Sequence, residues 1–135
     1  MSVLAILYVS TASIPEDGRE AALERLVKQA TTANTRAGLT GALMFSGNRF
    51  AQMLEGPSNA LDALMERIAA DPRHCEVTIL FHGAVAKRQF KSFSLVYSGS
   101  SVFVSRSISL PLARAKRGAP PELDNLIRLM VEFSR

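Results

Sequence analysis

The chain of 135 residues contains no tryptophan and a single cysteine, and aromatic residues make up only 7% of it. One cysteine, Cys75, excludes an intramolecular disulfide framework and any metal site built from several cysteines. We expect this free thiol to be a small buried apolar side chain. Without an indole, the aromatic candidates for one-electron chemistry are reduced to Tyr8 and Tyr97.

Long apolar runs and a basic leader are also missing. No stretch approaches the roughly 18 apolar residues of a membrane span, and the start Met1–Ala5 lacks the basic residues of a signal peptide. We therefore expect a cytoplasmic protein with no membrane association. The 16 Lys and Arg against 12 Asp and Glu give a net charge of +4. This small excess, with no aromatic residues interleaved in a basic stripe, favours a solvated surface, and a basic nucleic-acid-binding domain is only a minor alternative.

Hydrophobic periodicity predicts an α+β domain. Both alternate faces of Val3–Val9 are apolar, which is typical of a central strand covered on both sides. The predicted order is strand 3–9, helix 19–37, strands 39–45 and 49–55, helix 59–70, and strands 76–84 and 92–97. This βαββαββ order predicts a ferredoxin-like mixed sheet with two helices on one face.

Residues 98–135 are predicted to form an extension to a domain of residues 1–97. A Ser-rich stretch with a possible short strand at 102–104 leads to a linker with Arg114, Lys116 and Arg117. An amphipathic helix is predicted over 122–133, and its apolar face must cover either the chain's own sheet or another chain. No output enzyme fits in these 38 residues.

Three polar side chains fall on predicted apolar faces. Asn34 lies on the apolar stripe of the first helix, Gln52 lies between Phe50 and Leu54 on one strand face, and Tyr8 lies on an apolar strand face. The first and third strands are neighbours in a ferredoxin-like sheet, so these side chains should converge. A phenol and two carboxamides suit a planar heteroaromatic ligand rather than a metal, and no nucleophile–base pair accompanies them. Each is also compatible with a core polar residue that the backbone satisfies.

Three motifs occur in a specific order. Asn34–Gly41 reads N-x-x-x-G-L-T-G, Phe50–Pro57 reads F-x-Q-x-L-E-G-P, and Asp71–His74 reads D-P-R-H, all after the run Leu4–Ser10. With these elements the chain resembles the BLUF domain, a blue-light sensor that uses FAD, over roughly residues 1 to 97. The resemblance implies a ferredoxin-like fold that holds FAD non-covalently between two helices, with FMN and riboflavin still open. It implies a photoreceptor and not an enzyme.

The resemblance also implies roles for single residues. In the light, Tyr8 would give an electron and then a proton to the flavin, and rearrangement of the Gln52 amide would shift the absorption to the red. A carboxamide accepts at one end and donates at the other, so it can switch without a change of charge. Read without the resemblance, the pair Arg73 and His74 is a basic helix C-terminus that interacts with its dipole. The residues implied to contact the flavin are Tyr8, Asn34, Phe50, Gln52, Arg73 and His74.

The chain departs from the family at its fifth strand. The family reads R-x-F-x-x-W-x-M there, whereas Phe93 and Leu95 stand at the Trp and Met positions of this chain. Those positions are tied to signal relay and recovery in the family. The departure motivates an alternative, a flavin-free or photo-inactive interaction module of the same fold. We expect the output to be a changed surface, centred on the C-terminal helix and read by a homo-oligomer or an unidentified downstream protein.

Overall fold

The strands predicted up to residue 97 are all present in the computed structural model, which describes residues 3–99 and 121–134. They form one five-stranded sheet in the order β4-β1-β3-β2-β5. The strands are β1 (Val3–Ala12), β2 (Thr40–Phe45), β3 (Arg49–Gly56), β4 (His74–Val85) and β5 (Phe93–Ser98). The helices are α1 (Arg19–Arg36), α2 (Ser58–Ala70) and α4 (Pro121–Phe133).

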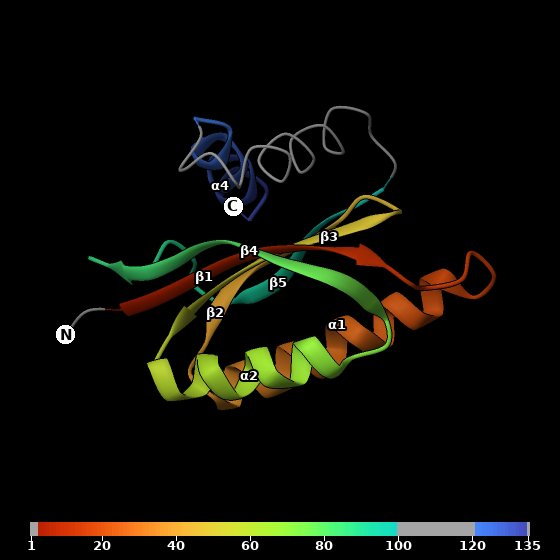
Figure 1. Cartoon of the computed structure of the whole chain (residues 1–135), viewed down its shortest axis with the longest axis horizontal. Helices are drawn as coiled ribbons and strands as arrows, with labels where there is room; N and C mark the ends of the chain where they lie inside the picture. Colours follow the sequence, from red (N-terminus) through yellow and green to blue (C-terminus); the bar gives the residue numbers. More distant parts are fainter. Residues whose placement is uncertain (1–2, 100–120, 135) are drawn as a thin grey trace.

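The sheet is mixed, as the sequence predicts. β1 lies between β3 and β4 and is antiparallel to both, while β2 is antiparallel to β3 and parallel to β5. Figure 1 shows α1 and α2 side by side on one face of the sheet and α4 on the other. The ferredoxin-like architecture, including the pairing of the first and third strands, is confirmed.

Two apolar cores form because β1 is apolar on both faces. Leu7 and Val9 point into a core beneath α4, which we call the α4 core, and Ile6 and Tyr8 point into a core beneath α1 and α2, the helix-pair core. Side chains alternate between the faces of a strand, so one strand supplies both cores. The site described below lies on the helix-pair side.

The C-terminal helix covers the chain's own sheet. Leu126 and Met130 are both 0% exposed and belong to the α4 core. Of the two partners that the sequence left open for this apolar face, the structure shows the intramolecular one. The possible strand at 102–104 and the basic residues at 114–117 lie outside the described residues.

Two details at the β1–β4 end differ from the sequence predictions. β1 continues to Ala12, which pairs with His74, because β4 starts two residues earlier than predicted and extends the ladder. Cys75 is exposed, so the expectation of a buried thiol is wrong. β4 is an edge strand of the sheet, and none of its residues is fully buried.

The last glycine of the N-x-x-x-G-L-T-G motif is required by the close approach of β3. Gly41 has a φ of +157°, and a Cβ atom placed on it would lie 1.8 Å from the carbonyl oxygen of Met53. A methyl group therefore cannot enter without separating β2 from β3, and only glycine avoids the clash.

Replacing Gly41 should therefore destabilise the fold. We expect Gly41→Ala to lower the free energy of unfolding by more than about 1 kcal/mol, measured by denaturant titration. Gly83→Ala is the control, because a Cβ there meets only the Phe81 ring at an ordinary 3.5 Å. Equal stabilities for the two variants would contradict this account of the motif.

Candidate ligand-binding site

A cavity of about 310 Å³ lies between the sheet and the helices α1 and α2. Small-molecule sites have volumes of about 300–1,000 Å³, so the cavity is large enough for a compact planar ligand. Side chains of β1, β2 and β3 line it on the sheet side, and side chains of α1 and α2 line it on the helix side. All six site residues predicted from the sequence line this cavity: Tyr8, Asn34, Phe50, Gln52, Arg73 and His74.

The pairing register of the sheet places Tyr8 against Gln52. The two residues are direct partners in the β1–β3 ladder, and both side chains are buried. The Tyr8 hydroxyl donates a hydrogen bond to Oε1 of Gln52. A register slip of one residue would send either side chain to the opposite face, so the ladder itself fixes this contact.

The Tyr8 phenol is held in its neutral form. Burial raises the pKa of Tyr8 well above its ordinary value, and the nearby negative charge of Asp71 raises the pKa further. The hydroxyl therefore remains a hydrogen-bond donor throughout the neutral and mildly alkaline range.

Asn34 presents an unsatisfied donor at the cavity. The residue is 1% exposed, and its Nδ2 atom has no hydrogen-bond partner in the described part of the chain. A buried polar group left unsatisfied costs about 1–3 kcal/mol. A core amide satisfied by the backbone, the alternative reading of Asn34, therefore does not describe this atom. A ligand with a carbonyl oxygen at this position would satisfy it.

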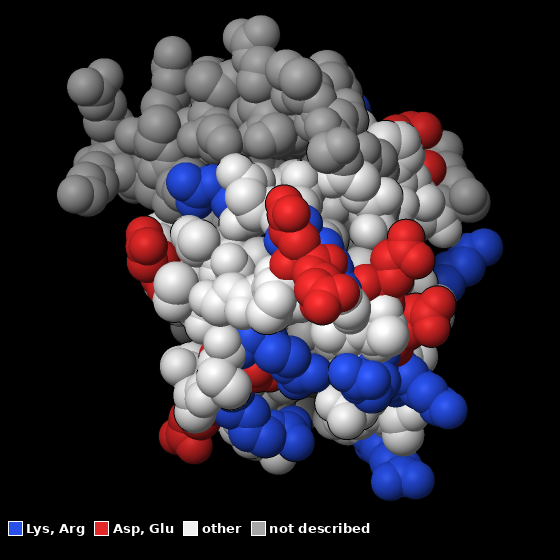
Figure 2. Space-filling view, turned by 90° about the vertical axis from the view of Figure 1, so that its right-hand side faces the viewer, with Lys and Arg blue, Asp and Glu red and all other residues white. Residues whose placement is uncertain are grey.

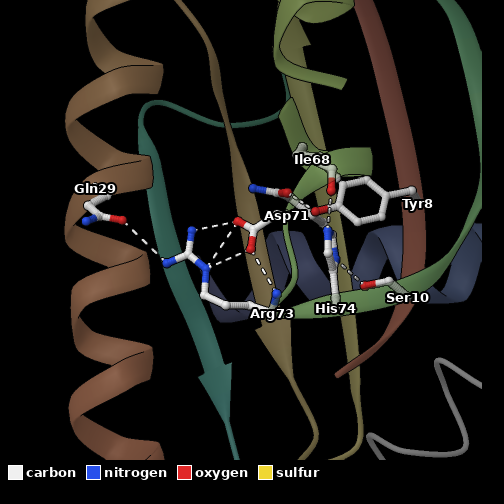
Figure 3. Close-up of polar contacts among 8 residues, drawn as sticks. Tyr8, Ser10, Gln29, Ile68, Asp71, Arg73 and His74 are labelled. Carbon is white, nitrogen blue, oxygen red and sulfur yellow. Dashed lines mark hydrogen bonds and ion pairs between the residues drawn. The ribbon is translucent and has the colours of Figure 1, made fainter. Parts of the chain in front are cut away.

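Two of the residues that line the cavity, Asp71 and Arg73, form an ion pair (Figure 3). Nη2 of Arg73 lies 2.6 Å from Oδ2 of Asp71, and Nη1 of Arg73 lies 3.4 Å from Oε1 of Gln29 on α1. The hydrogen bonds from Arg73 hold the pKa of Asp71 below its usual range. Arg73 thus connects the end of α2 to the side of α1 across the cavity.

His74 lines the cavity and also forms hydrogen bonds that hold the end of α2 and β1. Its Nε2 lies 2.7 Å from the carbonyl oxygen of Ile68, and its Nδ1 lies 2.8 Å from Oγ of Ser10 (Figure 3). A carbonyl oxygen only accepts, so Nε2 carries the hydrogen, and in the neutral ring Nδ1 accepts from the serine. The Ile68 carbonyl also accepts from the backbone N–H of Asp71, so His74 adds a second bond in the last turn of α2, in line with the helix-end reading. The ring also stands edge-on to Tyr8 and Phe50, with centroids 6.0 Å apart in each case.

Several lining residues were not picked out by the sequence. Their apolar members lie on the predicted inward stripes of the helices or, in the case of Leu43, on the predicted strand 39–45. Periodicity therefore placed them in the core but gave no sign of a cavity. Asp71 had a signal in the D-P-R-H motif, whereas Gln29 and Arg67 look like ordinary polar helix-surface residues. The further lining residues are Leu26, Gln29, Ala30, Ala33, Leu43, Leu64, Arg67, Ile68 and Asp71.

Phe93 and Leu95 lie on the same side of the sheet as the cavity. Phe93 is 3% exposed in the helix-pair core, and Leu95 packs against that core, but neither side chain lines the cavity. Their contribution to the site is packing behind it. Within residues 3–99 and 121–134, no three or more His, Cys, Asp or Glu side chains gather in a metal-binding group. No helix among these residues is long and apolar enough to cross a membrane.

Comparison with known sequences finds one family and several partial relatives. The BLUF family, described as sensors of blue light using FAD, matches residues 3–96. Photoactivated adenylate cyclase subunit beta of Euglena gracilis is 34% identical over 85 residues, covering 63% of this chain and 10% of that protein. The blue light- and temperature-regulated antirepressor BluF of Escherichia coli K12 is 34% identical over 68 residues, covering 50% and 17%. The chain thus spans about a tenth of the length of the cyclase subunit.

Solved structures share the fold along nearly the whole chain. The dark-state structure of BlrB, a BLUF protein, has a TM-score of 0.72 at 27% identity, covering 97% of this chain and 96% of that one. The solved structure of BlrP1 BLUF has a TM-score of 0.66 at 29% identity, covering 99% of this chain and 90% of that one. BlsA in its photo-activated state has a TM-score of 0.76 at 19% identity, covering 96% and 94%, and shows the shared fold.

The raised pKa of Tyr8 predicts a specific loss of stability in alkali. Above about pH 10, the ordinary pKa of tyrosine, the unfolded chain releases this proton while the folded chain keeps it. The free energy of unfolding should then fall with pH by up to ~1.4 kcal/mol per pH unit from this group alone. Tyr8→Phe should remove that part of the slope in denaturant titrations between pH 9 and about pH 11. Parallel pH profiles for the two proteins would contradict the burial of the phenol.

Proposed function

Because the chain belongs to the BLUF family of blue-light sensors, we propose that its cavity holds FAD and that Tyr8 and Gln52 form the light-dependent switch. Membership of the family makes the domain a flavin-binding blue-light sensor and not an enzyme. The observation that carries the assignment of residues is the buried hydrogen bond between Tyr8 and Gln52 on the sheet side of the cavity.

The residues around the cavity fit a flavin. An isoalloxazine ring has two apolar faces and a polar edge of carbonyl oxygens and ring nitrogens. The orphaned Nδ2 of Asn34 and the amide of Gln52 offer neutral hydrogen bonds for that edge. Apolar side chains from both helices and the sheet are available for the ring faces: Leu26, Ala30, Ala33, Leu43, Phe50, Leu64 and Ile68.

We assign Tyr8 the role of electron and proton donor. When bound, the flavin supplies the absorption of blue light and an excited state that accepts an electron. Tyr8 is the one phenol among the residues lining the cavity, and its raised pKa keeps the proton on the oxygen in the dark. Oxidation turns a phenol into a strong acid, and the proton of Tyr8 already lies in a hydrogen bond to Oε1 of Gln52. Loss of an electron and movement of this proton are therefore coupled by geometry.

We assign Gln52 the role of the switch because few polar side chains lie next to it among the described residues. Its cross-strand partners are Tyr8 on β1 and Leu43 on β2, and Leu95 on β5 follows next in the same row. Neither leucine has a hydrogen-bonding side-chain atom. A turned Gln52 amide thus changes its bonds to Tyr8 and to the ligand, without competition from Leu43 or Leu95.

Two substitutions test the switch by visible spectroscopy before and after blue light. The wild type should show flavin bands with a small, reversible red shift. Tyr8→Phe removes the donated proton and Gln52→Leu removes the amide, so both variants should keep the flavin bands and lose the stable shift. The control is Thr78→Val, which removes a hydroxyl on β4 that bonds the Glu76 carbonyl outside the cavity.

The outcomes separate the candidate functions. A normal light-induced red shift in Tyr8→Phe or Gln52→Leu would contradict the proposed roles of these residues. Wild-type protein that stays colourless after addition of FAD would favour the flavin-free interaction module instead.

We assign FAD rather than riboflavin because the cavity has basic residues at its edge. Figure 2 shows Lys and Arg side chains gathered over the lower half of one face, at the level of α1 and α2 in Figure 1. Arg67 and Arg73 both line the cavity, and Arg73 is engaged by Asp71. Arg67, exposed on α2, is therefore proposed to contact the diphosphate of FAD, a group that arginine binds well.

Binding titrations with FAD and riboflavin test this assignment. Arg67→Gln should weaken FAD binding by roughly 3–10-fold at low salt and leave riboflavin binding unchanged, because riboflavin has no phosphate. Arg25→Gln, an exposed residue of α1 that does not line the cavity, is the charge-matched control. Equal losses for both ligands would show that Arg67 acts on the shape of the cavity and not on phosphate.

The remaining assignments concern the setting of the domain. We propose that residues 1–97 sense light and that residues 98–135 present the output to a second copy of the chain or to a downstream protein. The names of two relatives place BLUF-like sequence in a cyclase and in an antirepressor. The exposed thiol of Cys75 suits a reducing compartment, which supports the cytoplasm.

A further inference from the structure

A buried carboxylate joins the strand of Gln52 to the connection between β4 and β5. Glu55 lies on β3, three residues after Gln52, and is 0% exposed. Because side chains alternate along a strand, Glu55 points to the α4 side of the sheet whereas Gln52 points into the cavity. One strand therefore carries a polar group at each face.

The carboxylate of Glu55 holds two successive backbone amides. Its Oε2 accepts from the backbone N–H of Gln89 at 2.6 Å, and its Oε1 accepts from the backbone N–H of Phe90 at 3.0 Å and from Oγ1 of Thr40 at 3.0 Å. In the part of the chain that the structure describes, Glu55 makes no ion pair. A buried charge is tolerated only when hydrogen bonds satisfy it, so these three donors are what hold the carboxylate here.

The exposed side chain of Arg88 also bonds the connection between β4 and β5 to neighbouring segments. Its Nη1 donates to Oγ1 of Thr40 at 2.9 Å and to the backbone oxygen of Glu55 at 3.1 Å. Its Nη2 donates to the carbonyl oxygen of Gly38, in the turn between α1 and β2, at 2.9 Å. Residues 86–92 are thus tied to the end of β3 by both backbone and side-chain bonds, which we call the Glu55 clasp.

The connection held by the clasp reaches both cores. Phe90 is 4% exposed in the α4 core, the core that contains Leu126 and Met130 of α4. Phe93, three residues later, is 3% exposed in the helix-pair core beside the cavity. A shift of the Gln89–Phe90 backbone relative to the sheet therefore moves a ring that packs in the same core as α4.

We propose that Glu55 is a positioning residue that transmits the state of Gln52 to α4. The route is β3, a stiff hydrogen-bonded strand, then the Glu55 carboxylate, then the backbone at Phe90, and then the α4 core. The two bonds from the Glu55 carboxylate to the neighbouring amides of Gln89 and Phe90 fix both the distance and the orientation of this backbone relative to β3. The β4–β5 connection therefore moves with β3. This inference rests on the proposed switch at Gln52.

Hydrogen exchange of the full chain, measured by mass spectrometry in the dark and under blue light, tests the route. The peptides to follow cover residues 86–96 and 121–134, and the visible spectrum of each sample is recorded in parallel. In the wild type, light should change the exchange of both peptides. Glu55→Gln puts an amide nitrogen against a backbone N–H, and should keep the red shift but lose the light-dependent exchange difference at α4. Glu66→Gln, the same charge change on the exposed side of α2, should behave as the wild type.

Each outcome decides the inference. A full exchange difference at α4 in Glu55→Gln overturns it, because a merely stabilising carboxylate would leave that difference intact. If Glu55→Gln does not retain flavin, Arg88→Ala decides instead, because it releases the exposed half of the clasp and leaves the buried carboxylate in place. A reduced α4 difference with a normal red shift in Arg88→Ala supports the route, and an unchanged difference overturns it.

The same data separate this inference from the proposed function. A wild type with a red shift but no light-dependent change at α4 overturns the route alone, whereas a wild type with bound flavin and no red shift overturns the switch itself.

Discussion

The pairing register between β1 and β3 is the constraint on which the site depends. It places a phenol directly across from a carboxamide, in a layer where both are removed from water. The contact is neutral, so its burial needs no counter-ion, and one hydrogen bond satisfies the Tyr8 hydroxyl. The raised pKa of Tyr8 follows from the same burial. A slip of one residue would send the Tyr8 hydroxyl from the helix-pair core to the α4 core, away from Gln52.

β3 combines two polar groups with different degrees of freedom. Among the described residues, the Gln52 amide oxygen accepts from Tyr8, and the leucine neighbours of Gln52 in the row have no hydrogen-bonding side-chain atoms. The Glu55 carboxylate, on the opposite face, is bonded at both oxygens to groups of two other segments. In the proposed relay, a rearrangement at Gln52 displaces β3, and the fixed Glu55 carboxylate carries the Gln89–Phe90 backbone with the strand.

Sequence periodicity found most of the fold and the centre of the site, for a physical reason. Polar residues on apolar faces are rare, so the sequence pattern singles out Tyr8, Asn34 and Gln52. Because the first and third strands are neighbours in a ferredoxin-like sheet, the pattern also predicts that these side chains lie close together. Periodicity reports the face of an element but not its tertiary neighbour. Arg67 therefore looked like a solvated helix residue, the surface covered by α4 stayed open, and Cys75 at a sheet edge was misjudged. Glu55 gave no sign of burial, because its three donors come from β2 and the β4–β5 connection.

The missing tryptophan bears on relay more than on photochemistry. Phe93 and Leu95 fill space behind the cavity without lining it, and neither side chain has a donor or acceptor to exchange with Gln52. Side-chain hydrogen bonding through these two β5 positions is therefore not available to this chain. The polar connection that the described residues do make from β3 to the far side of the sheet passes through Glu55. In this chain the C-terminal helix packs in the core into which that connection places Phe90.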